Sequence, residues 1–450
     1  MIDNFSIILI ILYFLVILYI GLSARKKEND EGFLLANRNL GTFALTGTML
    51  AGLFSGTAIV VTMSFVFNYG ISTVWAFFST TFGCFLLAAL VPKIKKLADE
   101  KKYYTFSDFF RGKFGKKIGL LIATVIFLLY LGYFLVQLIA GGIVLSALTN
   151  MPHFLSVLLI GSVIIFYIFA AGFKAVVKTD IFQCLIIILL VILSFNIFSH
   201  AKSIPLSDLN LFSAGPISII GFLLYGIMIM MLAAEFWQRI YAAKSIKVAK
   251  KSLMITGLTF LFLGILTVLI GLSVKSQFPD IVPTTALVIG FQNLLSGPLL
   301  GIGLVLLFAT IMSSADTHLF VLSSSLSKDF FAKSEKFSQS KLASNTKLFT
   351  IIVGIIGILI ASIFTKIIDI VTSIASVGLA LVPPIIFSFW FKLNPKSVFL
   401  SICFGILGAV GAFIFMGISI ESALFSLPVS LIVLGIGQII IKVKNKVYRP

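Results

Sequence analysis

The chain has 450 residues, of which 59% are hydrophobic and only 11% are charged. A soluble globular domain has about 25% charged residues, so the composition excludes that class and predicts an all-α protein that crosses the membrane many times. The net charge of +18 would also suit a nucleic-acid-binding protein, but its distribution along the chain indicates membrane topology instead.

Thirteen apolar segments are long enough to cross about 30 Å of hydrocarbon. The first is followed by Arg25, Lys26 and Lys27 and has no small-residue cleavage site after it, so we expect a retained helix rather than a signal peptide. The predicted spans are residues 6–22, 43–68, 71–91, 118–147, 153–171, 176–199, 216–236, 252–274, 298–325, 347–365, 370–391, 397–416 and 423–441.

Positive charge alternates between successive loops. When the loop after the first span is placed in the cytoplasm, all but three of the 34 lysine and arginine residues fall on the cytoplasmic side, and the exceptions are Lys202, Lys275 and Lys366. This positive-inside pattern predicts an outside N-terminus and a cytoplasmic C-terminus. Binding of anionic lipid or nucleic acid by the basic loops is the less favoured interpretation, and we expect no nucleic-acid partner.

The second span contains a stretch that is poorly suited to a continuous helix. Residues 46–56 read TGTMLAGLFSG and include three glycines, which weaken a helix. We therefore expect a break within the membrane that exposes backbone carbonyl groups, as in many transporters. The alternative is an intact helix whose small residues permit close packing. Residues 218–235 would be the equivalent helix of a second, inverted set of five spans, although the two halves show no residue-level similarity.

The ninth span carries polar groups at membrane depth, where they are costly unless they face a cavity, a partner or an ion. Thr310, Ser313, Ser314 and Thr317 share one helical face. Their oxygens would suit a small hard cation, and the neighbouring Asp316 strengthens this functional interpretation. The alternative is that small hydroxyl residues let helices pack closely and bond to their own backbone.

Four stretches, in order along nearly the whole chain, resemble motifs of the sodium:solute symporter family, which includes sodium/proline, sodium/pantothenate, sodium/sialic acid and sodium/glucose symporters. These stretches are GFLLANRNLG (32–41), AAGFKAVVKTDIFQ (170–183), QRIYAAKS (238–245) and ATIMSSADTHLFVLSSS (309–325). Each motif is weak alone, but four in the right order are specific.

The resemblance implies a LeuT-type fold within a single transporter domain, residues 1–450. An extra N-terminal helix (6–22) would precede two five-helix repeats of inverted orientation (43–199 and 216–391), and two C-terminal helices (397–441) would follow.

The resemblance also implies where sodium binds. The ligands would be the backbone carbonyls of Ala51 and Phe54, the carbonyl of Thr310, and the hydroxyls of Ser313 and Ser314.

A second site, for sodium or a proton, would use Asp180 with Asp316 and Thr317, which stand where some members have hydroxyl residues. The alternative for Asp180 is a cytoplasmic carboxylate that caps its helix or pairs with Lys178.

Departures from the family pattern bear on the solute. Ala233 and Ala234 replace the Asn-Gln pair of sugar carriers, and Leu53 replaces the Asp of sodium/proline carriers, so neither a sugar nor proline is indicated. A small, partly apolar solute with few hydrogen-bonding groups is expected instead, and a carboxylate is one such solute. The candidate solute-binding residues are Ser55, Thr57, Thr62, Gln137, Ile229 and Met230, with Phe54 as a further apolar wall.

Each of these candidates also has a packing interpretation. Gln137 and Thr62 would suit helix–helix hydrogen bonding, and Ile229 and Met230 would suit helix packing or lipid contact. Glu235 is expected to pair with Arg239 one turn later.

The predicted function is sodium-coupled symport of a small organic solute into a bacterial cell across its cytoplasmic (inner) membrane, with Na⁺ as the coupling ion. Two alternatives stay open: proton coupling through Asp180 or Asp316, and a membrane-embedded solute sensor. No histidine or cysteine metal cluster and no nucleophile–base pair is evident in the sequence, so an enzyme is not expected. The oligomeric state is not determined by the sequence.

Overall fold

The computed structural model describes residues 4–25, 29–199, 203–331, 341–364, 373–374, 376–418 and 420–447. Within these residues, eleven helices are long and apolar enough to cross a membrane. Two shorter apolar helices, Thr42–Leu53 and Ser376–Phe387, lie among them. The structure thus has about eleven candidate spans, and thirteen stays a prediction because residues 370–372 and 375 of the predicted eleventh span (370–391) lie outside the described residues.

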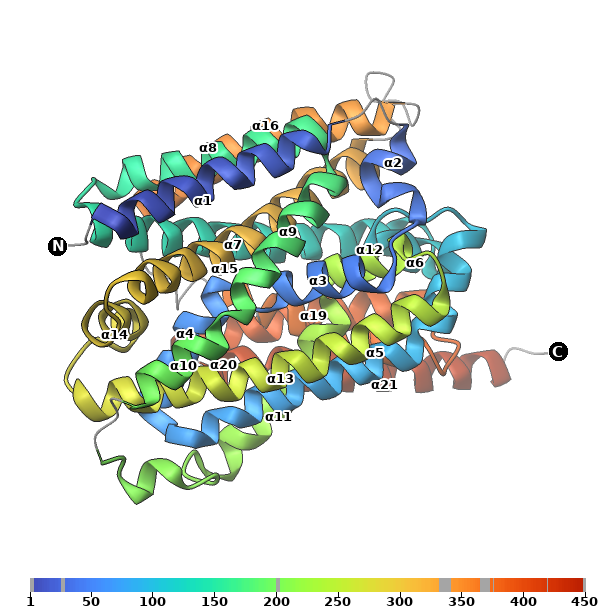
Figure 1. Cartoon of the computed structure of the whole chain (residues 1–450). Helices are drawn as coiled ribbons and strands as arrows, with labels where there is room; N and C mark the ends of the chain where they lie inside the picture. The colour runs from blue at the N-terminus through green and yellow to red at the C-terminus, as the bar shows by residue number, and fades with distance from the viewer. Residues whose placement is uncertain are drawn as a thin grey trace.

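The long helices form one bundle of roughly aligned rods, and the two ends of the chain lie at opposite ends of it (Figure 1). The long helices are α1 (Asn4–Ser23), α5 (Val74–Glu100), α7 (Lys116–Thr149), α8 (His153–Ala171), α9 (Phe173–Ile188), α11 (Gly215–Leu232), α13 (Ile246–Gln277), α15 (Pro298–Ser325), α16 (Leu342–Ile363), α19 (Pro395–Met416) and α21 (Ser426–Val447). The shorter α10 (Leu190–Ser199) continues the span that begins with α9.

Shorter helices close the two ends of the bundle. α2 (Asp30–Leu35) and α6 (Phe106–Phe114) lie at the end where the C-terminus emerges, and α14 (Ala286–Leu294) lies at the opposite end (Figure 1). The remaining short helices near the C-terminus are α18 (Val382–Phe387) and α20 (Ile420–Leu424).

The second predicted span is broken, as its glycine content predicts. α3 (Thr42–Leu53) ends at Phe54, whose ψ of 66° is not helical, and α4 (Gly56–Tyr69) begins after Ser55. The Ser55 hydroxyl accepts a hydrogen bond from the Ala58 amide at 3.0 Å and so caps α4. The break leaves the last carbonyl groups of α3 without helical partners in the middle of the protein.

A second break separates α11 (Gly215–Leu232) from α12 (Ala234–Ala242) at Ala233, whose ψ is 83°. Neither Gly221 nor Gly226 marks this break, since both lie within α11. The end of α12 pairs with the start of α3, because the Leu40 amide donates to the Ala242 carbonyl at 3.0 Å. The two interrupted helices therefore lie side by side.

The segment that leads into α3 is held by one arginine. Ala36, Asn37 and Arg38 have positive φ values of 50°, 56° and 52°, a conformation that is costly for residues other than glycine. The Arg38 guanidinium donates to the Glu31 carboxylate at 2.6 Å and to the Tyr103 carbonyl at 2.7 Å. The hydrogen bond from Arg38 lowers the pKa of the Glu31 carboxyl.

Close packing of α11 on α5 depends on glycine, which gives a first testable expectation. A Cβ atom at Gly226 would lie 2.7 Å from the Thr80 amide nitrogen and would clash with Ser79. We expect Gly226→Ala to lower the free energy of unfolding by about 1–3 kcal/mol, the usual cost of overpacking, as measured by thermal unfolding in detergent.

Gly221→Ala is the matched control, because Gly221 is on the same helix and nothing lies within 4 Å of a Cβ atom there. The control should be neutral or slightly stabilising, since alanine favours a helix by up to about 1 kcal/mol. Equal effects of the two substitutions would contradict the packing argument.

Candidate ion site and buried charge network

The end of α3 meets the middle of α15 through hydroxyl and carbonyl groups. The Ser313 hydroxyl donates to the Ala51 carbonyl at 2.9 Å, and the Ser314 hydroxyl donates to the Gly52 carbonyl at 3.2 Å. Both hydroxyls also lie within 3.3 Å of the Thr310 carbonyl. Ser313, Ser314 and Thr310 are fully buried. Five oxygen atoms from two helices therefore converge at one buried point.

This set of atoms fits a small hard monovalent cation. All five groups are neutral oxygens, and hard cations prefer oxygen ligands. Each serine has a single hydroxyl proton but lies near two carbonyl acceptors. A cation at this point would be coordinated by the oxygen lone pairs, and it would hold the end of α3 against α15.

Four of the five predicted sodium ligands lie together in the structure, and the fifth, Phe54, lies apart from them at the helix break. Ala51, Thr310, Ser313 and Ser314 come together, as described above. Phe54 lies at the break itself, where its amide donates to the Leu50 carbonyl at 2.9 Å. Gly52 supplies a carbonyl group that sequence reasoning missed, because a glycine in a glycine-rich stretch has no side chain to mark it as a ligand.

A second polar cluster lies beside this junction and is centred on a buried arginine. Arg239 of α12 is 1% exposed. Its Nη2 donates to the Asp180 carboxylate at 3.0 Å and to the Thr317 hydroxyl at 2.9 Å, and its Nε donates to the Thr48 hydroxyl at 2.9 Å. The Thr48 hydroxyl in turn donates to Asp180. One guanidinium thus joins α3, α9, α12 and α15.

Asp316 belongs to the same cluster but has different partners. Its Oδ2 accepts a hydrogen bond from the Tyr167 hydroxyl at 2.7 Å, and the Thr179 hydroxyl lies 3.3 Å away. Its Oδ1 is buried without a hydrogen-bond partner among the described residues, and so is Oδ1 of Asp180. The cluster therefore holds two buried carboxyl groups and a single arginine.

Two local interpretations of the charged residues are wrong. Asp180 is fully buried within α9 and pairs with Arg239, whereas the Lys178 ammonium lies 3.5 Å from the Ser23 carbonyl. The expected pair of Arg239 with the Glu235 carboxylate is not found among the contacts of the described residues. Arg239 donates instead to the backbone carbonyl of Glu235, at 3.4 Å. The long arginine side chain points into the core because the buried Asp180 is there to neutralise it.

The candidate solute-binding residues are spread over α4, α7 and α11. Ser55 caps α4, and the Thr62 hydroxyl donates to the Ala58 carbonyl of its own helix at 2.6 Å. Gln137 is buried on α7. Met230 packs against Gly83 of α5, which is the packing arrangement expected as the alternative.

The structure says less about the last two candidate solute-binding residues, Ile229 and Thr57. Ile229 is partly buried against the core. The side chain of Thr57 lies outside the part of the chain whose side chains are described.

Comparison with known proteins identifies the chain. The family described as "Sodium:solute symporter family" matches residues 33–405. The chain belongs to this family. It is a sodium-coupled solute symporter of the membrane and not an enzyme.

Two relatives of this symporter come from bacteria. It is 27% identical to "Sodium/proline symporter 2" of Staphylococcus saprophyticus over 86% of this chain and 81% of that protein. It is also 27% identical to "Osmoregulated proline transporter OpuE" of Bacillus subtilis over 85% of this chain and 83% of that protein.

Solved structures share the fold. A Na⁺-coupled sialic acid symporter in a substrate-bound outward-open state superposes with a TM-score of 0.84 at 17% identity, covering 97% of this chain and 98% of that one. The manganese transporter of Eremococcus coleocola superposes less closely, with a TM-score of 0.58 at 12% identity over 92% and 97% of the two chains. The predicted family and the helical membrane fold are thus confirmed.

Proposed function

We propose that this symporter binds one sodium ion between α3 and α15 and couples its inward movement to uptake of a small organic solute. The ligands are the carbonyls of Ala51 and Thr310 and the hydroxyls of Ser313 and Ser314, with Gly52 or Phe54 supplying a further carbonyl. The observation that carries this proposal is the pair of serine contacts to the last turn of the interrupted helix.

Sodium at this position would act on the conformation of the symporter. It would hold the broken helix against α15 and favour an outward-open state, to which the solute then binds. The solute would lie at the break and contact Ser55, Thr57, Thr62, Gln137, Ile229 and Met230. Closure around the solute and rocking of one repeat against the other would release both to the cytoplasm.

The repeat architecture and the orientation belong to the same proposal. The helices interrupted at Phe54 and Ala233 would be the first helices of two five-helix repeats, 43–199 and 216–391. An N-terminal helix (6–22) would precede the repeats and two C-terminal helices (397–441) would follow them, all within one domain (1–450). The positive-inside pattern places the N-terminus outside and the C-terminus in the cytoplasm of a bacterial inner membrane.

The sodium gradient supplies enough free energy for this cycle. One charge that moves through 100 mV releases about 2.3 kcal/mol, and a tenfold concentration gradient adds about 1.4 kcal/mol. Together they could sustain an accumulation of roughly several hundredfold for each sodium ion.

Uptake into proteoliposomes tests the proposal directly. With an inward sodium gradient, uptake of radiolabelled solute should exceed uptake in potassium by at least about tenfold. L-Proline is the first solute to test, because two curated relatives are named for it, although Leu53 argues against it. Equal uptake of every solute in sodium and in potassium would refute sodium coupling.

A second coupled cation is the main alternative, and the buried charges favour it. Arg239 neutralises one of the two carboxyl groups of Asp180 and Asp316, so a sodium ion or a proton near Asp316 and Thr317 would balance the other. Uptake that is independent of sodium and driven by an inward pH gradient would establish proton coupling. A membrane-embedded sensor would instead give no uptake into liposomes that contain this protein alone.

A further inference from the structure

A cavity of about 690 Å³ opens on the surface of the bundle beside α21, near the end where the C-terminus emerges (Figure 1). Its apolar wall consists of Leu431, Leu434 and Ile441 of α21 together with Phe387 and Phe391, which lie at and just after the end of α18. A volume of this size is typical of sites that bind small molecules. Because α21 belongs to a candidate membrane span, the cavity opens toward lipid.

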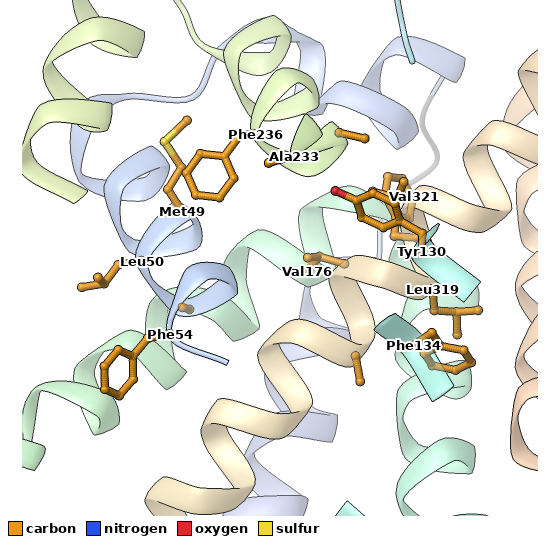
Figure 2. Packing of buried hydrophobic residues seen from close by; sticks show 14 of the residues in the cluster. Met49, Leu50, Phe54, Tyr130, Phe134, Val176, Ala233, Phe236, Leu319 and Val321 are labelled. Atoms are coloured by element: carbon orange, nitrogen blue, oxygen red, sulfur yellow. The ribbon is translucent and has the colours of Figure 1, made fainter. Parts of the chain in front are cut away.

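The space beside α21 is not filled by neighbouring helices. In the core of the bundle, by contrast, side chains such as Met49 and Phe236 are fully buried (Figure 2). Gly435 lines the cavity, and nothing lies within 4 Å of a Cβ atom there. At Gly437, a Cβ atom would lie 2.9 Å from Cβ of Ser397 on α19. One face of α21 therefore packs on α19, and the face of Gly435 is left open.

One part of the cavity wall is polar and donates hydrogen bonds. It consists of Lys392, Asn394 and Gln438. The Asn394 amide donates to Oε1 of Gln438 at 3.2 Å, so Nε2 of Gln438 carries the donors of that side chain. This Nε2 is buried without a hydrogen-bond partner among the described residues. Lys392 is exposed, and the described residues that line the cavity include no acid. The polar wall thus suits an anion that accepts hydrogen bonds.

Further positive charge lies along the segment that joins α18 to this polar wall. Lys93 of α5 donates to the Phe389 carbonyl at 3.1 Å, and Lys113 of α6 donates to the Ser388 carbonyl. Burial and the positive charge of Lys93 lower the pKa of the Lys113 ammonium. Three lysines, counting Lys392, therefore lie at residues 388–392, and a bound anion would reduce the repulsion between them.

The same segment has the features of a membrane–water interface. Trp390 is 54% exposed, and the Lys93 ammonium lies 5.9 Å from the centre of its ring. Tryptophan is enriched at the level of the lipid headgroups, and basic pockets between helices on the cytoplasmic side bind anionic headgroups. The positive-inside pattern explains why lysines gather at this face, but it does not explain an open apolar cavity beside them.

We propose that this cavity is a binding site for one anionic phospholipid, such as phosphatidylglycerol. An acyl chain lies along Leu431, Leu434 and Ile441, and the phosphate accepts hydrogen bonds from Lys392 and from Nε2 of Gln438. The site is separate from the proposed sodium and solute sites. Its assignment to the cytoplasmic leaflet follows from the proposed orientation, whereas lipid binding in detergent does not depend on that orientation.

A second copy of the chain is a less suitable occupant of the cavity. A twofold contact places the same surface of each copy against the other, so the lysines of both copies would meet without acidic partners. An anionic phospholipid instead complements both the charge and the apolar wall.

Photoactivatable phosphatidylglycerol and phosphatidylcholine, each with the reactive group on an acyl chain, test the site on the full-length protein in detergent. Phosphatidylglycerol should give saturable labelling of residues 387–396 and 431–441, and phosphatidylcholine should bind several-fold more weakly. Lys392→Gln should weaken binding of phosphatidylglycerol about fivefold, the effect of one lysine near an anionic lipid. Lys247→Gln is the matched control, because Lys247 is an exposed lysine of α13 at the same predicted face, and it should leave labelling unchanged.

A second pair of variants tests the apolar part of the site. Gly435→Leu places a side chain in the open space, and it should abolish labelling of both segments. Gly411→Leu is its control, because nothing lies within 4 Å of a Cβ atom at this position of α19 and Gly411 does not line the cavity. Labelling should persist in this control. Cooperative thermal unfolding of every variant in lipid-free detergent shows that it is folded.

Three results would overturn the lipid site. The first is equal labelling by the two lipids, and the second is labelling of residues 431–441 that persists in Gly435→Leu. The third is a dimer that is stable without lipid and whose copies crosslink through residues 431–441, since a second copy would then occupy the cavity.

Discussion

Purified Ser313→Ala is expected to unfold at the same temperature in sodium as in potassium, whereas the wild-type protein should be stabilised by sodium alone. The Ser313 hydroxyl joins α15 to the Ala51 carbonyl at 2.9 Å, and its oxygen is one of the five that would surround the ion. Sodium at about a hundred times its dissociation constant adds about 2.7 kcal/mol to the free energy of unfolding. The measurement is thermal unfolding in sodium, lithium, potassium and choline at constant ionic strength.

Ser323→Ala is the matched control for this substitution. Ser323 is also fully buried on α15, but its hydroxyl donates to the Leu319 carbonyl of its own helix at 2.7 Å. The control should keep the full gain from sodium. A sodium-specific gain that survives in Ser313→Ala would place the ion elsewhere, and the Asp180–Asp316 cluster would be the next region to test.

The ion site could be anticipated from the sequence because its signals are local. Glycines at positions 47, 52 and 56 weaken one helix, and the hydroxyl residues of α15 repeat at helical spacing. Each pattern lies within a single helix, and the periodicity of the helix decides which face the oxygens share. The break at Phe54 and the contacts of Ser313 and Ser314 accordingly lie where the pattern predicts.

The charge network could not be anticipated in the same way. Asp180 and Arg239 are 59 residues apart in the chain, and the nearer Glu235 is the partner that helix spacing favours. The helix break at Ala233, in an apolar stretch without a nearby glycine, has no local signal either. Both features depend on how α12 lies against α3 and α9, which is determined by tertiary packing.

Arg239→Gln is expected to be the most destabilising substitution in this network, at about 3–5 kcal/mol. It removes the single positive charge that faces Asp180 and leaves two buried carboxyl groups without a counter-charge. It also removes the donors to the hydroxyls of Thr48 and Thr317. Thermal unfolding in detergent measures the effect, and Lys250→Gln, an exposed lysine of α13, is the matched control for loss of one positive charge.

The charge count predicts an asymmetry that a double-mutant cycle can detect. Asp180→Asn leaves Arg239 with Asp316 as the remaining acid, so the cluster stays neutral and the cost should be smaller than for Arg239→Gln. The double variant lacks both members of the ion pair and should be more stable than Arg239→Gln alone, because one fewer carboxylate is left without a counter-charge. If the two single effects simply add, Arg239 and Asp180 do not act as a pair, and the guanidinium stabilises the protein through its hydroxyl contacts instead.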